Sequence, residues 1–339
     1  MPFPYLPRDD QDETLFRIED PFGLRSVIIP LFSIDRETEE ISGIGTAFRV
    51  DPFGTCLTAY HVLESRETRN FFNSPELGTV FGFFSPGMVL GRPSIPRESF
   101  VFLHEAATIR GERESPLLHL PNEMVNVFDC AKLIFDPRSP KVQQHRGFLP
   151  LQVYGGNPPA VGDRVMAVGY PGVMNVQHVP ERNLVHFTEG LHGAVGTITE
   201  ILPQGRNANR RWPTFVVSSK WPSGISGGPI FNENGYVIGI VSSSLHDPDV
   251  DELTEGYSFW FRPIPAMRGF LPSIDADNEG SLRVWGVLRQ NPWKLAGIFA
   301  IREQAEAYRD ELGGDYEAIF GSNRFGTDDF VYSQENNPA

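Results

Sequence analysis

The sequence predicts an all-β fold of short strands joined by tight turns. Glycine and proline are abundant, with 33 and 29 residues among 339, and 26 phenylalanines accompany them. The apolar segments are short and rich in β-branched and aromatic residues, and they lack the 3.6-residue period of a helix, which is typical of barrels and sandwiches. In chain order they occupy residues 26–32, 45–50, 55–59, 127–135, 163–168, 194–201, 214–218, 229–231, 236–241 and 257–261.

The stretches between these runs carry turn and loop signals. DPFGT at 51–55 and NENGY at 232–236 are hairpin-turn sequences, because glycine and asparagine tolerate positive φ. Residues 64–126 are more polar, and we interpret them as a decorated connection with a few strands of its own. We interpret residues 172–193 as an exposed loop and residues 1–24 as an extended arm.

The C-terminal region changes character after about residue 272. Residues 293–312 are predicted to form an amphipathic helix that ends at Gly313-Gly314. Its apolar side favours docking on the rest of the fold, and that side comprises Leu295, Ile298, Phe299, Ile301 and Ala305. The alternative is a partner-binding element, with the anchors Trp285, Trp293 and Phe320. The polar tail at 326–339 is expected to be mobile.

Composition and charge narrow the function classes. The length fits two domains, and 40% hydrophobic residues supply a core. A formal net charge of −14 disfavours nucleic acid and membrane surfaces as partners, because an acidic surface repels phosphate groups. Cys56 and Cys130 are the two cysteines, and we expect both to be buried core residues without a disulfide. The acidic, proline-broken N-terminal sequence has no signal-peptide pattern, so we expect a cytoplasmic location.

The most specific feature is a glycine-rich run at 223–231, SGISGGPIF. It places Ser226 between Gly224 and the pair Gly227-Gly228, in a segment unsuited to helix or regular strand. Glycines here let the backbone turn tightly and bring N–H groups to one point, as an acyl-transfer enzyme requires for a developing oxyanion. The alternative interpretation is a glycine-rich surface turn whose serine has no chemical role.

Two further residues can complete a nucleophilic site. His61 follows an apolar run, at the point where a strand gives way to a turn, and imidazole suits a general base near neutral pH. Asp129 lies inside the apolar run 127–135, where a buried carboxylate needs a partner such as a histidine N–H. Each has a simpler alternative: a solvent-facing or core histidine, and an edge-strand acid that points outward.

These residues occur in the order His61, Asp129, Ser226, and the sequence around them resembles the chymotrypsin-like (trypsin-fold) serine peptidases, in particular the bacterial branch without disulfides. The segments that carry the resemblance are GTAFRVDPFGTCLTAYHV, FDCAKLIF, VGYPG and GISGGPIFNENGYVIGIVSS. The resemblance covers about residues 25–270 and implies two six-stranded antiparallel β-barrels followed by a C-terminal α-helix.

On this resemblance the chain divides into four parts. An N-terminal arm at 1–24 precedes a first barrel at 25–150, which carries the histidine and the aspartate. The second barrel at 151–272 carries the serine. Residues 273–339 lie outside the resemblance and form the helical extension and polar tail.

The resemblance also implies a mechanism of peptide hydrolysis. Ser226 attacks the scissile carbonyl, His61 moves the proton to the leaving amine, and Asp129 holds the imidazole. The backbone N–H groups of Gly224 and Ser226 form the oxyanion hole, and no metal or organic cofactor is needed. The predicted function is a serine endopeptidase of narrow range that acts on proteins or peptides. The alternatives are a catalytically silent binding or scaffold protein, and an esterase that uses the same serine.

Two departures from the family bear on regulation. Val62 stands where secreted digestive members carry a cysteine. Ile225 stands where those members carry the aspartate that pairs with a freshly cleaved N-terminus. Zymogen activation of that kind is therefore not predicted, and a separate protein activator stays open as a partner.

The resemblance places the base of the primary substrate pocket six residues before the serine, at Lys220. The predicted walls of this pocket are Ser242, Ser243, Ser244, Gly256 and Ser258. A lysine at the base favours an acidic side chain in the substrate, whereas the alternative is a solvent-facing Lys220 and a shallow polar pocket. Because the net charge is −14, an acidic substrate requires local positive charge near the site.

Overall fold

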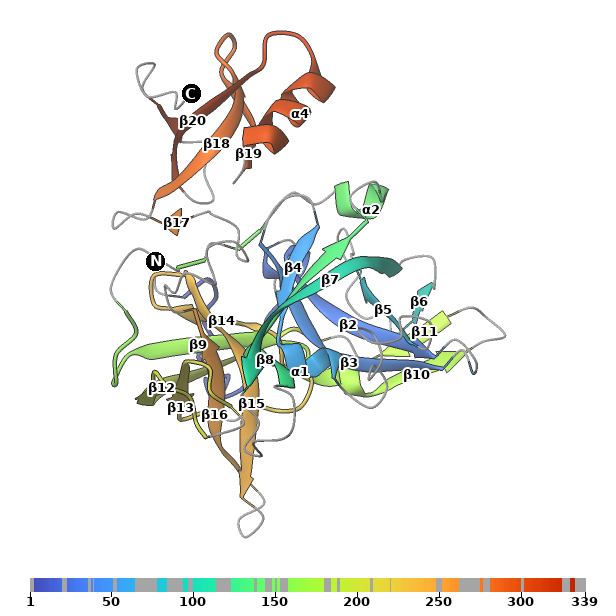
Figure 1. The fold of residues 1–339 in the computed structure, drawn as a ribbon, viewed down its shortest axis with the longest axis vertical. Helices are drawn as coiled ribbons and strands as arrows, with labels where there is room; N and C mark the ends of the chain where they lie inside the picture. Colours follow the sequence, from blue (N-terminus) through green and yellow to red (C-terminus); the bar gives the residue numbers. More distant parts are fainter. Residues whose placement is uncertain are drawn as a thin grey trace.

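The structure is a computed structural model and is mostly β, which confirms the predicted fold class (Figure 1). It describes residues 3–19, 23–35, 38, 40–50, 54–64, 78–83, 94–96, 100–113, 123–136, 139–143, 148–149, 151–152, 158–179, 184–187, 190–207, 210–219, 221–247, 252–261, 275–276, 281–299, 302–324 and 330–332. In these ranges, no helix has both the length and the apolar character needed to cross a membrane.

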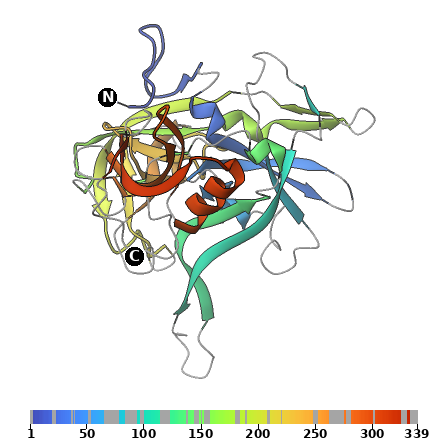
Figure 2. The same cartoon turned by 90° about the horizontal axis from the view of Figure 1, so that it is seen from above.

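The first barrel closes in the strand order β2-β3-β4-β8-β7-β5. Its strands are β2 (Ile28–Asp35), β3 (Ile41–Arg49), β4 (Thr55–Thr58), β5 (Gly78–Phe83), β7 (Phe100–Arg113) and β8 (Glu123–Phe135). Gly54, in the predicted hairpin turn before β4, has a φ of 96° that favours glycine. The strands β7 and β8 are the longest of this barrel and project from it as a hairpin (Figure 2).

The second barrel is a curled sheet in the order β12-β13-β16-β15-β14-β9, in which β9 also pairs with β12 and completes a circuit of six strands. Its strands are β9 (Arg164–Gly169), β12 (His192–Leu202), β13 (Thr214–Val217), β14 (Pro229–Asn232), β15 (Val237–Asp247) and β16 (Glu252–Trp260). Gly235, in the predicted turn between β14 and β15, has a φ of 83°. The apolar runs identified in the sequence therefore coincide with barrel strands.

The remaining elements of the barrel region are short. They are η1 (Leu24–Ser26), α1 (Tyr60–Leu63), α2 (Pro140–Gln143), η3 (Pro171–Met174), β6 (Ser94–Pro96), β10 (Val176–Val179) and β11 (Leu184–Phe187). The expectation of an exposed loop at 172–193 is wrong for its central part, because β10 and β11 pair antiparallel and β6 adds to β11. These four-residue runs are too short for periodicity to distinguish a strand from a loop.

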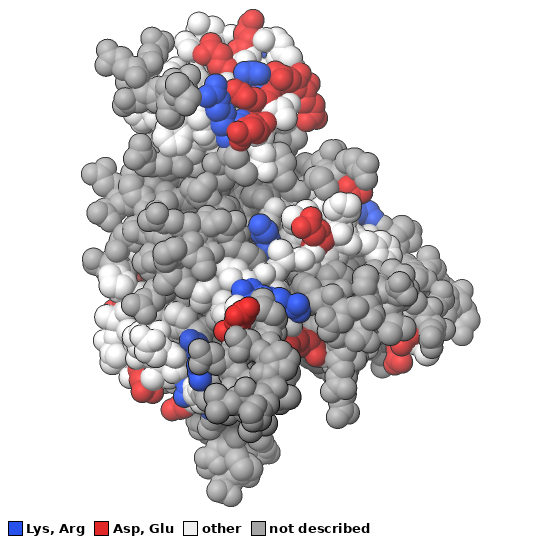
Figure 3. All heavy atoms as spheres, viewed as in Figure 1, with Lys and Arg blue, Asp and Glu red and all other residues white. Residues whose placement is uncertain are grey.

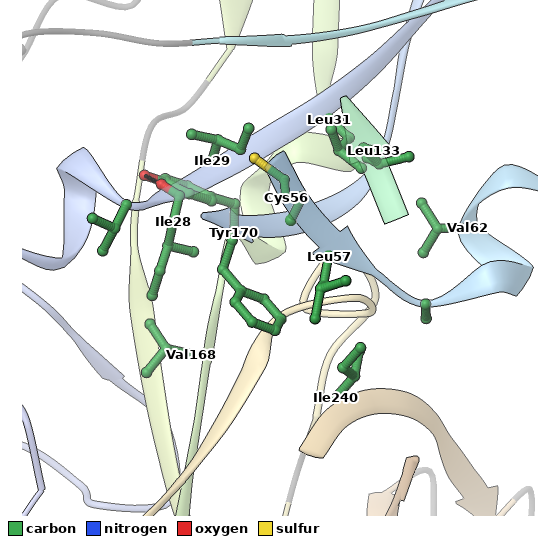
Figure 4. Close-up of a cluster of buried hydrophobic side chains, with 14 of the residues drawn as sticks. Ile28, Ile29, Leu31, Cys56, Leu57, Val62, Leu133, Val168, Tyr170 and Ile240 are labelled. Carbon is green, nitrogen blue, oxygen red and sulfur yellow. Dashed lines mark hydrogen bonds between the residues drawn. The ribbon is translucent and has the colours of Figure 1, made fainter. Parts of the chain in front are cut away.

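One hydrophobic core joins the two barrels. It contains first-barrel residues such as Ile28 and Leu57 together with Val168, Tyr170 and Ile240 from the second barrel (Figure 4). The hydroxyl of Tyr170 also donates to the backbone oxygen of Ile28 at 3.1 Å. Burial of each large apolar side chain contributes about 1.5–3 kcal/mol, so this shared core fixes the seam between the barrels.

The N-terminal arm docks on the second barrel. Its strand β1 (Phe16–Arg17) pairs with β12, and Phe16 lies opposite Gly193. A Cβ at Gly193 would come within 2.6 Å of the Phe16 ring, so glycine is required for this close approach. Phe3 is also buried, and Glu13 pairs with Arg164 of β9 at 2.7 Å.

The predicted helix at 293–312 is wrong in its first half. Lys294–Phe299 is a strand, β19, that pairs with β18 (Ser281–Arg289), and the helix α4 covers only Arg302–Leu312. Pairing with β18 overrides the helical pattern, and Gly297 is a poor helix former whose Cα faces the rings of Phe299 and Tyr308. The strands β17 (Asp275–Ala276), β20 (Glu317–Arg324) and β21 (Phe330–Val331) complete the sheet.

This C-terminal sheet has cores of its own. Ala305 of α4 is buried with Trp285, Val287 and Phe299, so the helix packs on its own sheet. The sheet's other cluster includes Phe148 and the partly buried Tyr236 from the barrel region.

The structure also describes predicted anchor residues and part of the predicted tail. Trp285 is buried and contacts Phe320 with ring centroids 5.5 Å apart, whereas Trp293 is exposed. Phe330 is buried in β21, so the expectation of a mobile tail is wrong at 330–332. The rest of the predicted tail lies outside the described residues.

Candidate active site

His61 stands at the end of a strand, in the first turn of α1. The strand β4 ends at Thr58, Ala59 is extended, and α1 begins at Tyr60. The His61 ring atom Nδ1 lies 2.9 Å from Oδ2 and 3.1 Å from Oδ1 of Asp129. The backbone N–H of His61 also donates to Asp129 Oδ1 at 3.0 Å, so one carboxylate fixes both the ring and the main chain of the histidine.

Asp129 lies within β8, beside β4, with 2% of its side chain exposed. The hydroxyl of Ser242 on β15 donates a third hydrogen bond to its Oδ2. Burial alone would raise the pKa of Asp129, but the charge and hydrogen bonds of His61, together with the Ser242 hydroxyl, outweigh it and hold the pKa below its usual value. The carboxylate therefore stays ionised and fully partnered between the two barrels.

The pKa of the His61 imidazole shifts in the opposite direction, upward. Burial alone would lower its pKa, but the charge and hydrogen bond of Asp129 raise it above its ordinary value of 6.5. Arg210 acts against this increase and Glu64 adds to it. The side chain keeps 40% of its surface exposed, so its outer ring edge is accessible to a reacting group.

The glycines of the 223–231 run fix the Ser226 loop against the segment that precedes His61. Gly227 has a φ of 86°, and a Cβ there would lie 2.1 Å from Thr58 Oγ1 and 3.1 Å from the Ala59 nitrogen. The backbone oxygen of Ser226 accepts a hydrogen bond from the N–H of Thr46 at 2.8 Å. The loop of the second barrel is therefore seated against the Thr58 hydroxyl and the Ala59 backbone nitrogen, three and two residues before His61.

Thr46 on β3 connects these parts, a role that the sequence analysis missed. Its hydroxyl donates to the backbone oxygen of Gly224 at 2.7 Å and accepts from the N–H of Tyr170 at 3.0 Å. Its own backbone oxygen accepts from the hydroxyl of Thr58 at 2.7 Å. Thr46 is fully buried, so all these bonds lie inside the seam between the barrels.

The two N–H groups predicted to form the oxyanion hole lie in this loop. Gly224 has a φ of 94°, and a Cβ would lie 2.6 Å from the Tyr170 oxygen. Neighbouring amides are used internally, since those of Gly227 and Gly228 donate to Val241 and Ile225. Among the described residues, the N–H groups of Gly224 and Ser226 donate to no protein group, which leaves them available to a ligand.

The residues predicted to line the substrate pocket differ in their contacts, and some lie outside the described residues. Lys220 lies outside the described residues, and so does the side chain of Ser244 in β15. Gly256 lies against the ring of Trp221, where a Cβ would come within 2.3 Å. The Ser258 hydroxyl is buried and bonds to both the N–H and the oxygen of Phe215, which links β13 and β16. A pocket lined by these residues stays a prediction.

Ser242 and Ser243 have partners that the sequence did not indicate. The hydroxyl of Ser242 faces Asp129, as described above, whereas the hydroxyl of Ser243 accepts a hydrogen bond from Arg210 Nη1 at 3.0 Å. The register of β15 against β16 shifts between Val241 and Ser243, and such bulges re-aim side chains. No local sequence signal links Arg210 to this strand, which lies 33 residues further along the chain.

The structure also shows where the two residues that depart from the family pattern and the two cysteines lie. Ile225 is fully buried in the core of the second barrel, and Val62 is buried at the seam. Cys56 and Cys130 are both free and buried, which confirms the expectation for these residues. Burial raises the pKa of the Cys130 thiol well above its usual value, as the neighbouring Asp129 also does.

A two-barrel β fold with a buried Asp–His pair at its seam, and a glycine-bounded serine loop seated beside it, defines a peptidase-like architecture. The chain belongs to the trypsin-like peptidase family, whose domain model matches residues 45–240. This confirms the resemblance seen in the sequence.

Solved structures of two proteases are similar to this chain. For the active form of the Rv3671c protease from M. tuberculosis, the identity is 16% and the TM-score 0.41, over 70% of this chain and 77% of that protein. For Deg5, the identity is 15% and the TM-score 0.41, over 70% of this chain and 84% of that protein. A comparison with curated proteins finds no match.

Proposed function

We propose that this chain is a serine endopeptidase that cleaves its substrates through an acyl-enzyme on Ser226. The observation that carries the proposal is the seating of the Ser226 loop on Thr58 and Ala59, directly before the histidine that Asp129 holds. Membership of the trypsin-like peptidase family supports proteins or peptides as the substrates.

Acylation begins with the Asp129–His61 pair. Asp129 accepts a hydrogen bond from the protonated Nδ1 of His61. The lone pair on Nε2 is therefore free to accept the proton of the Ser226 hydroxyl. The serine oxygen bonds to the scissile carbonyl carbon, and the carbonyl π electrons move onto its oxygen. The imidazolium formed on His61 is stabilised by Asp129 and then donates its proton to the leaving amine as the C–N bond breaks.

The Ser226 loop stabilises the charge that develops in this step. The free N–H groups of Gly224 and Ser226 donate to the oxyanion, and a donor of this kind typically contributes about 3 kcal/mol in the transition state. A water molecule, deprotonated by His61, then attacks the acyl ester. Collapse of the second oxyanion releases the carboxylic acid product and returns the proton to Ser226.

A fluorophosphonate probe, which phosphonylates activated serines, tests the proposal. We expect the full-length protein and the Ser223→Ala variant to be labelled and to cleave a denatured protein, and Ser226→Ala to do neither. Ser223 is a matched control because it is exposed on the same loop. Persistent labelling in Ser226→Ala, or a folded wild type that is neither labelled nor active, would remove the assignment. Labelling together with hydrolysis of esters but not of peptides would indicate the esterase instead.

A further inference from the structure

We propose that Arg210 is a specificity residue that binds an acidic side chain of the substrate next to the scissile bond. The proposal rests on the peptidase function proposed above and names the substrate class of that same site. Its basis is a guanidinium group held against Ser243, on the strand that also supplies Ser242 to Asp129.

Arg210 precedes β13, and its backbone is hydrogen-bonded to residues that follow β12. Its N–H donates to both the backbone oxygen and the side-chain oxygen of Asn207, each at 3.1 Å. Its backbone oxygen accepts the N–H of Arg206 at 2.8 Å and lies 2.2 Å from where a Cβ on Gly205 would be. These hydrogen bonds restrain the backbone of Arg210, which lowers the entropy cost of recognition.

The side chain reaches toward the reacting groups. Arg210 Nη1 donates to the Ser243 hydroxyl at 3.0 Å, and the adjacent Ser242 donates to the carboxylate that holds His61. The positive charge of Arg210 also lowers the pKa of His61, against the larger effect of Asp129, so its field reaches the imidazole. The guanidinium is thus held on the strand that also contacts the Asp129–His61 pair, and we expect a peptide bound with its scissile carbonyl at Ser226 to pass along it.

The charge of Arg210 is not neutralised within the described chain. Arg8, Arg164 and Arg302 each pair with a carboxylate, whereas no described carboxylate lies within ion-pair distance of Arg210. Its neighbour Arg206 is engaged differently, since it stacks 3.7 Å above the ring of Tyr257. A partly buried cation that has no counter-ion among the described residues carries a desolvation cost that a substrate carboxylate would offset.

This arrangement supplies the local positive charge that an acidic substrate requires. The net charge of −14 gives a field that repels acidic peptides, and the described Lys and Arg side chains on the face shown in Figure 3 form small groups among acidic ones. Arginine can bind a carboxylate with two parallel hydrogen bonds, a geometry that lysine lacks. Ser243 holds one guanidinium nitrogen and leaves the other donors of the fork for the substrate.

The test uses the full-length enzyme and peptides that differ only by Glu, Gln or Lys at each position around one cleavage site. We expect one position at which the wild type prefers Glu to Gln by roughly 10–100-fold in kcat/KM, the range expected for a charge-assisted hydrogen bond. Arg210→Gln should reduce this ratio to near one, and Arg210→Glu should favour Lys at the same position. Arg211→Gln, which removes a charge from the adjacent residue, should keep the wild-type ratio.

The outcomes separate this proposal from the peptidase assignment. If Ser226 is labelled but the wild type shows no preference for Glu at any position, or if Arg210→Gln keeps the preference, the proposal is wrong and the peptidase assignment stands. Equal losses for the Glu and Gln peptides in Arg210→Gln would show that Arg210 only supports Ser243, which also overturns it. Should that variant fail to fold, stronger inhibition of the wild type by a Glu than by a Gln phosphonate peptide supports the proposal, and equal inhibition contradicts it.

Discussion

The first barrel and the second barrel build their shares of the site by different means. In the first barrel, Asp129 binds the ring and the N–H of His61 directly, so one side chain fixes the other. In the second barrel, the Ser226 loop contacts the backbone of Thr46 and the hydroxyl of Thr58 across the seam. The histidine side therefore depends on one carboxylate, whereas the serine side depends on glycine conformation and on a buried threonine.

This difference has a consequence for mutational effects. Substitutions on the histidine side should change the chemistry and leave the fold largely intact, because the contact between Asp129 and His61 joins two elements of the first barrel, β8 and α1. Substitutions on the serine side should reduce stability and activity together, because the same contacts join the two barrels.

We expect Asp129→Asn to have the largest effect on catalysis. The amide keeps the shape of the carboxylate but favours the wrong histidine tautomer and removes the charge that stabilises the imidazolium, a change that costs about 10⁴-fold in kcat in a Ser-His-Asp triad. The measurement is steady-state cleavage of one peptide at pH 7. Asp163→Asn is the control, because Asp163 is an exposed acid that also accepts a backbone N–H, at 2.8 Å from Ala160. A loss below tenfold would contradict the role of the pair.

Gly227→Ala should damage stability and activity together. Its Cβ would lie 2.1 Å from Thr58 Oγ1 and 2.2 Å from the Thr46 oxygen, at a φ of 86°. Strain and displacement together should cost about 3–5 kcal/mol of unfolding free energy, with loss of probe labelling. Gly235→Ala is a matched control, because its φ is 83° but no atom lies within 4 Å of its Cβ position. We expect only about 1–2 kcal/mol there, in urea unfolding, and equal costs would show that packing at Gly227 is unimportant.

Thr46→Val tests the link between the barrels with a smaller change. It preserves the shape but removes the hydroxyl that donates to the Gly224 oxygen and accepts from the Tyr170 N–H, so both buried hydrogen bonds are lost. We expect a loss of about 2–4 kcal/mol and slower labelling of Ser226. Thr46→Ser, which keeps the hydroxyl, should lose about 1 kcal/mol and label at the normal rate. Normal labelling of Thr46→Val would show that this bond does not position the loop.

The smallest expected effect is a shift in the pH dependence of activity when Arg210 is replaced. His61 acts as a base only when neutral, so kcat/KM should rise as the pH passes through a His61 pKa that lies above 6.5. The charged groups that act on this ring are Asp129, Arg210 and Glu64. Because Arg210 lowers the His61 pKa, Arg210→Gln should move the rising limb to higher pH, and Arg210→Lys should leave it in place. A limb that moves to lower pH would contradict this assignment.

The sequence was sufficient for the features that are local in the chain. Strand runs, glycine turns and the candidates His61, Asp129 and Ser226 are each recognisable within a few neighbouring residues. Contacts between distant residues were missed, since the hydroxyl of Thr46 bonds to a backbone oxygen 178 residues away. The contact of Arg210 with Ser243, 33 residues further along the chain, has no local sequence signal for the same reason.

The C-terminal error has a different cause. Residues 294–299 and the following helix form one continuous amphipathic pattern in the sequence. Partner strands decide between strand and helix in such a segment, and the pairing of β19 with β18 lies outside any local window. The same pairing builds the sheet on which the apolar face of α4 packs, whereas the sequence favoured packing on the barrels.

The most direct test of the central claim is the site of covalent modification by a fluorophosphonate, determined by mass spectrometry of proteolytic fragments of the labelled full-length protein. The geometry predicts a single adduct on Ser226 that requires His61 and is therefore absent from a folded His61→Ala variant. An adduct on another serine, or undiminished labelling of Ser226 without His61, would contradict the account.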